Sequence, residues 1–339
     1  MNIGIAPGAD KVGPGIQQIA TAWLTEFGQA AIATVVSTWG SSPVPVGGQL
    51  VIAPDGRFEG SISGGCVEVE VIVEAQAVME RGKPALLSFG VDDETAWSVG
   101  LPCGGTIQVL LEALNGETDR AFLEALLNAA GRRAPLFVVT DVETGMREYG
   151  ESLALPEEIA AKARAGKSFL AERGETQIFV HALMPVTRLL IVGASHIAQH
   201  LCALARTVGY DVVVVDPRSA FSTAARFGDV DLRVEWPEAA IPEIGLDGRT
   251  AVVVLSHVAQ LDDEALRLAL RSGCLYIGAL GSKRTHANRL ERLRAAGFSE
   301  DELARIHAPI GLNIGAVGPA EIAVSILAEV IQTARTGDL

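Results

Sequence analysis

The sequence predicts an α/β protein in which a mixed α/β domain precedes a Rossmann-like domain with a parallel sheet. Its 339 residues correspond to about two domains. It is 49% hydrophobic and has 36 glycines, many of them beside apolar runs, as expected for tight turns between strands and helices. From about Arg188 onward apolar strands alternate with helices, which is typical of a parallel sheet covered on both faces. We therefore place the domains at residues 1–185 and 186–339.

The first domain is predicted to contain short strands and few helices. Apolar residues at helical spacing and a following glycine indicate a helix over 15–27. Two further helices are expected at 67–81 and 120–130, and residues 141–185 are expected to be strand and polar loop. The predicted strands cover residues 30–37, 49–53, 58–63, 84–89, 106–111 and 134–140.

The second domain has a more regular pattern. Four helices are predicted, at 197–208, 262–271, 283–296 and 319–335. Between them lie the predicted strands, at 188–192, 211–215, 232–236, 250–255, 275–279 and 306–312. In an open sheet of this kind, ligands bind at the carboxyl ends of the strands.

The first strand of this domain runs into Gly193-Ala-Ser-His-Ile-Ala198, which has the position of a dinucleotide-binding glycine motif. Asp216 ends the next strand, near the spacing of an acidic residue that holds a ribose hydroxyl. The helix that follows offers free N–H groups to a phosphate. Ser195, however, takes the second glycine position, where its Cβ would crowd a pyrophosphate. A Rossmann-like fold without a dinucleotide is therefore an equal alternative. His196 either faces solvent or donates a hydrogen bond to the ligand.

Three more loops follow predicted strands, at residues 256–257, 278–284 and 311–316. Gly281 and Asn313 lie in two of them. Lys283 and Arg284 fall in the first turn of a helix, where cations oppose the helix dipole, so they indicate a nearby anion. The alternative is an ordinary pair of surface cations.

Two cysteines lie among glycines in the first domain. Cys66, in Ser63-Gly-Gly-Cys66-Val-Glu68, is expected at a helix N-terminus, which favours a thiolate. Cys103, in Leu101-Pro-Cys-Gly-Gly105, is expected in a loop. Two such thiolates suit a soft metal or a sulfur relay, although small buried cysteines are the alternative. Cys202 and Cys274 are predicted to be core residues, and the acidic stretch 92–94 a solvated loop.

Composition narrows the function classes. A net charge of −14 without a long basic run argues against nucleic-acid binding. We expect no membrane span and no signal peptide, and from the cysteine usage we expect a cytoplasmic protein with reduced thiols. Motifs of the common hydrolases and nucleoside triphosphatases are absent.

In combination, several motifs resemble the XdhC/CoxI accessory proteins of molybdenum hydroxylases. The resemblance runs from about Gly15 to Arg335, although the family's Rossmann loop leads us to expect a glycine where this chain has Ser195. The motifs are Trp39-Gly-Ser-Ser-Pro-Val-Pro, Ser61-Ile-Ser-Gly-Gly-Cys-Val-Glu68, Leu101-Pro-Cys-Gly-Gly105, Gly278-Ala-Leu-Gly-Ser-Lys-Arg284, Pro309-Ile-Gly-Leu-Asn-Ile-Gly-Ala316 and Glu321-Ile-Ala-Val-Ser-Ile.

The resemblance implies a chaperone rather than a stand-alone enzyme. It implies that the chain binds molybdenum cofactor, either molybdopterin or its cytidine dinucleotide, and supports its sulfuration with a cysteine desulfurase. The cofactor then passes to an apo-enzyme of the xanthine dehydrogenase type. By position, Cys66 and Cys103 become the candidate metal contacts or sulfur carriers, and Glu68 a cofactor-binding residue. We expect the cofactor phosphate on the Gly193 loop, a site shared by the two domains, and a homodimer.

Two rival functions remain open. An NAD(P)-dependent oxidoreductase would need the Gly193 loop to hold a pyrophosphate, and His257 is its only candidate for hydride transfer. A pure scaffold would instead dock a desulfurase onto its client enzyme without holding the cofactor.

Overall fold

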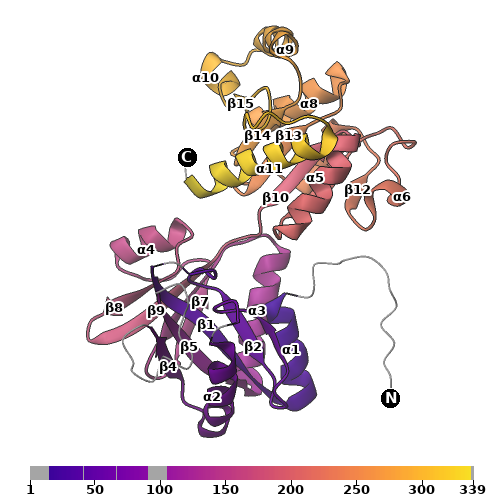
Figure 1. The fold of residues 1–339 in the computed structure, drawn as a ribbon. Helices are drawn as coiled ribbons and strands as arrows, with labels where there is room; N and C mark the ends of the chain where they lie inside the picture. The colour runs from indigo at the N-terminus through magenta and orange to yellow at the C-terminus, as the bar shows by residue number, and fades with distance from the viewer. Residues whose placement is uncertain (1–14, 41, 66, 91–104, 337–339) are drawn as a thin grey trace. The chain divides into compact units, whose positions relative to one another are not determined.

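The computed structural model describes residues 15–40, 42–65, 67–90 and 105–336. The chain divides into two compact units, Pro14–Pro185 and Val186–Leu339, and each is considered by itself (Figure 1). Both candidate cysteines of the first domain, Cys66 and Cys103, lie outside the described residues, as does the acidic stretch 92–94.

The first unit is built around an antiparallel five-stranded sheet in the order β3-β2-β1-β5-β4. Successive side chains of β1 point to opposite faces of this sheet. Ala30 and Ile32 pack with helices α1 and α3 on one face, whereas Ala31 and Ala33 pack with α2 on the other. The elements are α1 (Ile16–Phe27), β1 (Gln29–Trp39), β2 (Gln49–Ile52), β3 (Phe58–Gly60), α2 (Glu68–Arg81), β4 (Ala85–Phe89), β5 (Thr106–Asn115) and α3 (Gly116–Gly131).

A second antiparallel sheet, in the order β7-β6-β9-β8, completes this unit. The expectation of only strand and polar loop after residue 140 is wrong, because a short helix, α4, packs Ile159 and Ala163 against this sheet. It has only eight residues, four of them charged, so its helical pattern in the sequence is short. The elements are β6 (Leu136–Asp141), β7 (Arg147–Gly150), α4 (Glu157–Arg164), β8 (Phe169–Arg173) and β9 (Thr176–Leu183).

The second unit confirms the predicted Rossmann-like fold. Six parallel strands follow the order β12-β11-β10-β13-β14-β15. Starting from β10, the next two strands lie toward one edge of the sheet, and the strands from β13 onward lie toward the other edge. The strands are β10 (Arg188–Val192), β11 (Asp211–Val215), β12 (Asp231–Arg233), β13 (Thr250–Val254), β14 (Tyr276–Ala279) and β15 (Ile306–His307).

Helices cover both faces of this parallel sheet. Apolar side chains of α5 and α11 pack on one face, and those of α7, α8 and α9 pack on the other. The helices are α5 (His196–Thr207), α6 (Ala224–Phe227), α7 (Pro237–Ile244), α8 (Ala259–Leu270), α9 (Lys283–Ala295), α10 (Glu300–Leu303) and α11 (Pro319–Thr336).

Several boundaries differ from the sequence prediction. Strand β15 ends at His307 rather than Leu312, two residues before Pro309, which has no N–H to donate to a ladder. Strand β12 ends at Arg233, before α7 begins at Pro237. Helix α8 begins at Ala259, three residues earlier than predicted. In the first unit, β3 ends at Gly60 and α3 begins at Gly116.

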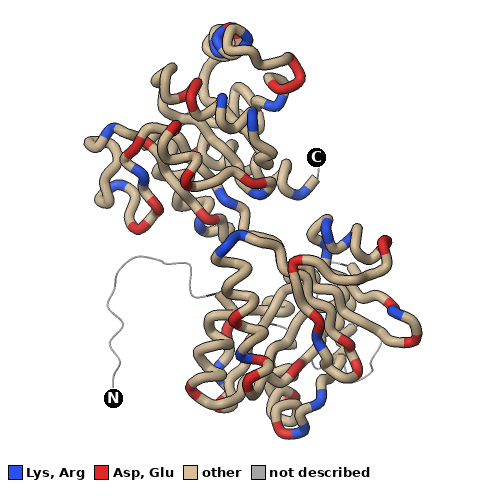
Figure 2. Tube along the Cα trace, turned by 180° about the vertical axis from the view of Figure 1, so that it is seen from behind, with Lys and Arg blue, Asp and Glu red and all other residues tan. Residues whose placement is uncertain are grey.

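Charged residues of both signs are interspersed along the chain in both units (Figure 2). Basic residues gather on α9, at the top of that view, where five of 13 residues are Lys or Arg and one is acidic. No helix among the described residues is long and apolar enough to cross a membrane.

Candidate functional site

The loop after β10 is shaped by Gly193 and Ser195. Gly193 has a φ of +108°, and a Cβ there would lie 2.6 Å from both the N and the Cα of Ser256. Only glycine therefore lets this loop pass the end of β13. The Ser195 hydroxyl accepts the N–H of Ala198 at 3.2 Å, so Ser195 is the N-cap of α5. A serine at the second glycine position of the motif is therefore explained by its capping of α5.

Asp216 directly follows β11 and lies beside this loop, as its spacing predicted, and its carboxylate is already engaged. It accepts the N–H of Ala194 at 2.8 Å and two bonds from the Arg218 guanidinium, at 2.9 and 2.7 Å. Burial opposes the charged form, but the bonds from Arg218 and Ala194 outweigh it and lower the pKa of Asp216. A ribose hydroxyl would have to compete with Arg218, which also stacks on Phe221.

The remaining predicted residues of this unit spread over several loops. His196 is exposed at the start of α5, with its ring 5.0 Å from that of His200. Lys283 and Asn313 are also exposed, and Gly281 has a φ of +143° just before α9. Their binding roles stay predictions.

Cys202 and Cys274 are confirmed as core residues. Both side chains are buried in the hydrophobic core of the second unit. Burial raises the pKa of Cys202 to about 12 and also raises that of Cys274. Neither thiol is suited to nucleophilic chemistry.

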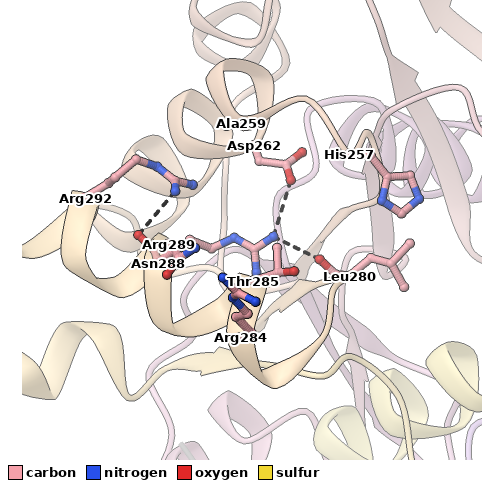
Figure 3. A pocket seen from close by; sticks show the side chains of 9 residues that line it. All are labelled: His257, Ala259, Asp262, Leu280, Arg284, Thr285, Asn288, Arg289 and Arg292. Carbon is pink, nitrogen blue, oxygen red and sulfur yellow. Dashed lines mark hydrogen bonds and ion pairs between the residues drawn. The ribbon is translucent and has the colours of Figure 1, made fainter.

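A pocket of about 390 Å³ lies between α8 and α9, beside the loops that follow β13 and β14 (Figure 3). This size is within the range of small-ligand pockets. The pocket brings together Arg284 and His257, which sequence analysis had placed in separate loops. His257 has a φ of +58°, which is strained for a residue with a side chain. Gly281, Lys283 and Asn313 do not line the pocket.

Arg289 is the least exposed side chain of this pocket, at 1%. Its Nη2 donates to the carbonyl of Leu280 at 2.9 Å and lies 3.3 Å from a carboxylate oxygen of Asp262. Its Nε and Nη1 atoms are buried and have no hydrogen-bond partner among the described residues. Such buried, unpaired donors of a charged group are costly, so they mark this guanidinium as incompletely satisfied.

Asp262 links Arg289 to the end of β13. Its other oxygen accepts the Ser256 hydroxyl at 2.5 Å. Burial raises the pKa of Asp262, and the bonds from Ser256 and Arg289 oppose this only in part. The next residue, Asp263, pairs with the half-exposed Arg292.

Sequence analysis missed Arg289, Asp262, Thr285 and Asn288. A signal was present in the spacing, because Thr285 and Arg289 are four residues apart, as are Arg284 and Asn288, and so share one face of α9. The partner Asp262 was not detectable, because it depends on how α8 packs on α9.

In the first unit, Glu68 organises the loop before α2. Its side chain is 6% exposed, and its carboxylate lies against the backbone on both sides of position 66. Hydrogen bonds from the loop lower its pKa to about 2, although burial alone would raise it. The donors are the N–H groups of Ile62, Ser63, Gly64, Gly65 and Val67 and the hydroxyls of Ser61 and Ser63. The structure therefore gives Glu68 a local structural role, and contact with a cofactor stays a prediction.

Replacing Glu68 with glutamine is expected to destabilise the first unit by up to about 3 kcal/mol at neutral pH, since the amide cannot accept this set of donors. Because the pKa in the folded protein lies below the ordinary value of 4.5, this stabilisation is present above pH 4.5 and is lost as the pH falls toward about 2. This stabilisation is measured by urea unfolding of wild type, Glu68→Gln and the exposed control Glu70→Gln at several pH values. Equal midpoints for all three proteins would contradict this account.

Comparisons with known proteins agree with this architecture. Residues 189–330 match the XdhC Rossmann domain, and residues 23–90 match the XdhC and CoxI family. A Bacillus subtilis protein named as a probable xanthine dehydrogenase subunit is 30% identical over 93% of this chain and 96% of its own length. The molybdenum cofactor insertion chaperone PaoD of Escherichia coli is 32% identical over 89% of this chain and 82% of its own length.

A solved structure extends the likeness to the fold. The crystal structure of a protein described as a xanthine dehydrogenase from Bacillus halodurans superposes with a TM-score of 0.75 and 28% identity. The match covers 94% of this chain and 96% of that one. Together with the two matched domains and the two curated relatives, these likenesses show that the chain belongs to the XdhC and CoxI family.

Proposed function

We propose that this protein is a molybdenum cofactor chaperone that binds the cofactor and supports its insertion into a xanthine dehydrogenase-type apo-enzyme. The observation that carries the proposal is the similarity, over most of both chains, to a protein named as a molybdenum cofactor insertion chaperone. The name of the Bacillus subtilis relative supports the same class of client enzyme. We place this activity in the cytoplasm, and the chain acts as a homodimer.

The Rossmann unit suits the anionic end of such a cofactor. Molybdopterin ends in a phosphate and its cytidine form in a pyrophosphate, and both would be attracted to helix N-termini and guanidinium groups. The helix starts at Ser195 and Ser282 and the side chain of Arg284 supply these features. Gly193, His196, Asp216, Gly281, Lys283 and Asn313 remain the proposed residues around them.

The thiols of the first unit are proposed to serve the metal end. Cys66 and Cys103 would contact molybdenum or carry sulfur received from a cysteine desulfurase, since thiolates are soft ligands and good nucleophiles. The Glu68 carboxylate supports this proposal by fixing the backbone of residues 65 and 67, directly beside Cys66.

The proposal is tested by activation of an apo-enzyme of the xanthine dehydrogenase type with cofactor-loaded protein. We expect the wild-type chain to raise the recovered activity and Cys66→Ala/Cys103→Ala to lose this effect. The control is Cys202→Ala, which removes a buried sulfur from the second unit and should keep the effect. If the double variant still binds cofactor and still activates the apo-enzyme, the thiols have been assigned wrongly.

One observation argues against the rival function of a nicotinamide-dependent oxidoreductase. Arg218 already engages both oxygens of Asp216, the residue that would have to hold the ribose of the dinucleotide. Titration with NADH, followed by fluorescence, is expected to show no saturable micromolar binding. Tight binding that is lost in Asp216→Asn would favour the rival. A scaffold that never holds the cofactor would instead bind the desulfurase and client while carrying no pterin.

A further inference from the structure

We infer that the pocket between α8 and α9 is a phosphate subsite, in which the buried charge of Arg289 and the donors of Arg284, Thr285 and Asn288 hold a phosphate group of the ligand. Figure 3 shows the Arg289 guanidinium in the middle of this group of side chains. The choice of the cofactor phosphate as the natural occupant rests on the proposed function, whereas the presence of an anion site rests on the pocket itself.

The charges around the pocket leave it positive. Asp263 holds Arg292 through two bonds, of 2.5 and 3.0 Å. Asp262 faces Arg289 through one contact of 3.3 Å and shares its remaining oxygen with the Ser256 hydroxyl. No carboxylate among the described residues pairs with the exposed Arg284. In a chain with a net charge of −14, an uncompensated cation beside a buried arginine indicates a site for an anion.

The unpartnered nitrogens of Arg289 are the second, independent indication. Nε and Nη1 of a side chain that is 1% exposed have no acceptor within the described structure. Native proteins rarely leave buried donors of a charged group without a partner. An anion in the adjoining pocket would supply the acceptor that these two nitrogens lack.

The start of α9 adds donors at the same place. Ser282 accepts the N–H of Thr285 at 3.1 Å, while the N–H groups of Lys283 and Arg284 have no acceptor within the helix. The dipole of a 13-residue helix makes this end favourable for negative charge. An anion bound here would offset the repulsion between this end of the helix and the two cations of its first turn, Lys283 and Arg284.

The donor set favours phosphate over a carboxylate. Two guanidinium groups, the Thr285 hydroxyl, the Asn288 amide and a helix start offer more donors than the two oxygens of a carboxylate accept. A phosphate ester presents three acceptor oxygens and up to two negative charges. The exposed His257, on the opposite side of the pocket, would then lie along the part of the ligand that leaves the pocket (Figure 3).

The test measures binding of inorganic phosphate to the full chain at constant ionic strength, by calorimetry and by the rise in melting temperature. Variants Arg284→Gln and Arg289→Lys are compared with Arg294→Gln. Arg294 lies on the same helix but pairs with Glu300 and does not line the pocket. We expect Arg284→Gln and Arg289→Lys each to weaken phosphate binding about tenfold or more, and the control to bind as wild type. If Arg289→Lys fails to fold, Arg284→Gln alone decides, because its side chain is exposed.

A second arm measures how much molybdenum cofactor each protein retains after gel filtration. Loss of both phosphate and cofactor in the two variants supports the subsite and its occupant. Loss of phosphate binding with full cofactor retention overturns the assignment of the cofactor phosphate, while the proposed function stands. A wild type that retains no cofactor but binds phosphate through Arg284 contradicts the proposed function and leaves the anion site. Phosphate binding that is absent, or unchanged in Arg284→Gln, overturns the inference.

Discussion

Replacing Asp262 with alanine is expected to lower the free energy of unfolding of the Rossmann unit by about 3–5 kcal/mol. The variant leaves Arg289, which is 1% exposed, without a facing carboxylate and removes the nearer of the two acceptors of the Ser256 hydroxyl. Removing one partner of a buried ion pair costs this much because the other charge stays buried without compensation. Urea unfolding, followed by circular dichroism, measures the loss.

Two variants separate this cause from a general loss of packing. Asp263→Ala, one residue along, should cost only about 1 kcal/mol, since the Arg292 side chain is 41% exposed and water can replace the carboxylate. Asp262→Ala/Arg289→Met should recover part of the lost stability, because it removes both charges together. Added phosphate should also stabilise Asp262→Ala more than wild type. Equal losses for Asp262→Ala and Asp263→Ala would show that the buried guanidinium is not the cause.

Replacing Gly193 with alanine is expected to destabilise the same unit by about 3 kcal/mol or more. The new Cβ would meet backbone atoms of Ser256 at 2.6 Å, and these atoms continue β13 and cannot rotate away. Overpacking of this kind and the positive φ of +108° both raise the energy of the folded state. Because the same shift would displace the loop at the carboxyl end of the sheet, ligand binding should weaken as well.

Gly209→Ala is the matched control for this prediction. Gly209 follows α5 with a φ of +80°, and a Cβ there would meet nothing within 4 Å. Alanine at this position should therefore cost about 1–2 kcal/mol, which is the backbone strain alone. The difference between the two variants in chemical denaturation isolates the clash with Ser256. If Gly193→Ala costs no more stability than Gly209→Ala, the close approach of Gly193 to the backbone of Ser256 is contradicted.

The parallel sheet was predictable because its signals are local. Each strand is a short apolar run, and each following helix has its own spacing and cap, such as Ser195 and Ser282. The helix α4 was missed because it spans only eight residues, and the end of β15 was placed too late because a proline ends the pairing soon after it. The position of Arg284 at the start of a helix also follows from the sequence alone.

The pocket itself was not predictable, because its chemistry depends on long-range packing. Arg289 sits in a helix with five basic residues, and its spacing from Thr285 places it on one face without showing that its side chain, unlike that of Arg294, is buried. Only the packing of α8 against α9 buries one of them beside Asp262 and leaves the other in solvent. In the same way, Glu68 was recognisable as part of a motif, but its role as acceptor for a whole loop depends on a folded backbone.

The central claim, that this chain holds molybdenum cofactor, is tested most directly by its pterin and molybdenum content. The protein is purified anaerobically from a host that makes the cofactor and, in parallel, from one that lacks the pathway. We predict that pterin and molybdenum co-elute with the chain in a fixed ratio from the first host only, and that Arg284→Gln lowers this ratio while Arg294→Gln does not. Wild-type protein that carries neither pterin nor molybdenum from the cofactor-producing host would contradict the claim.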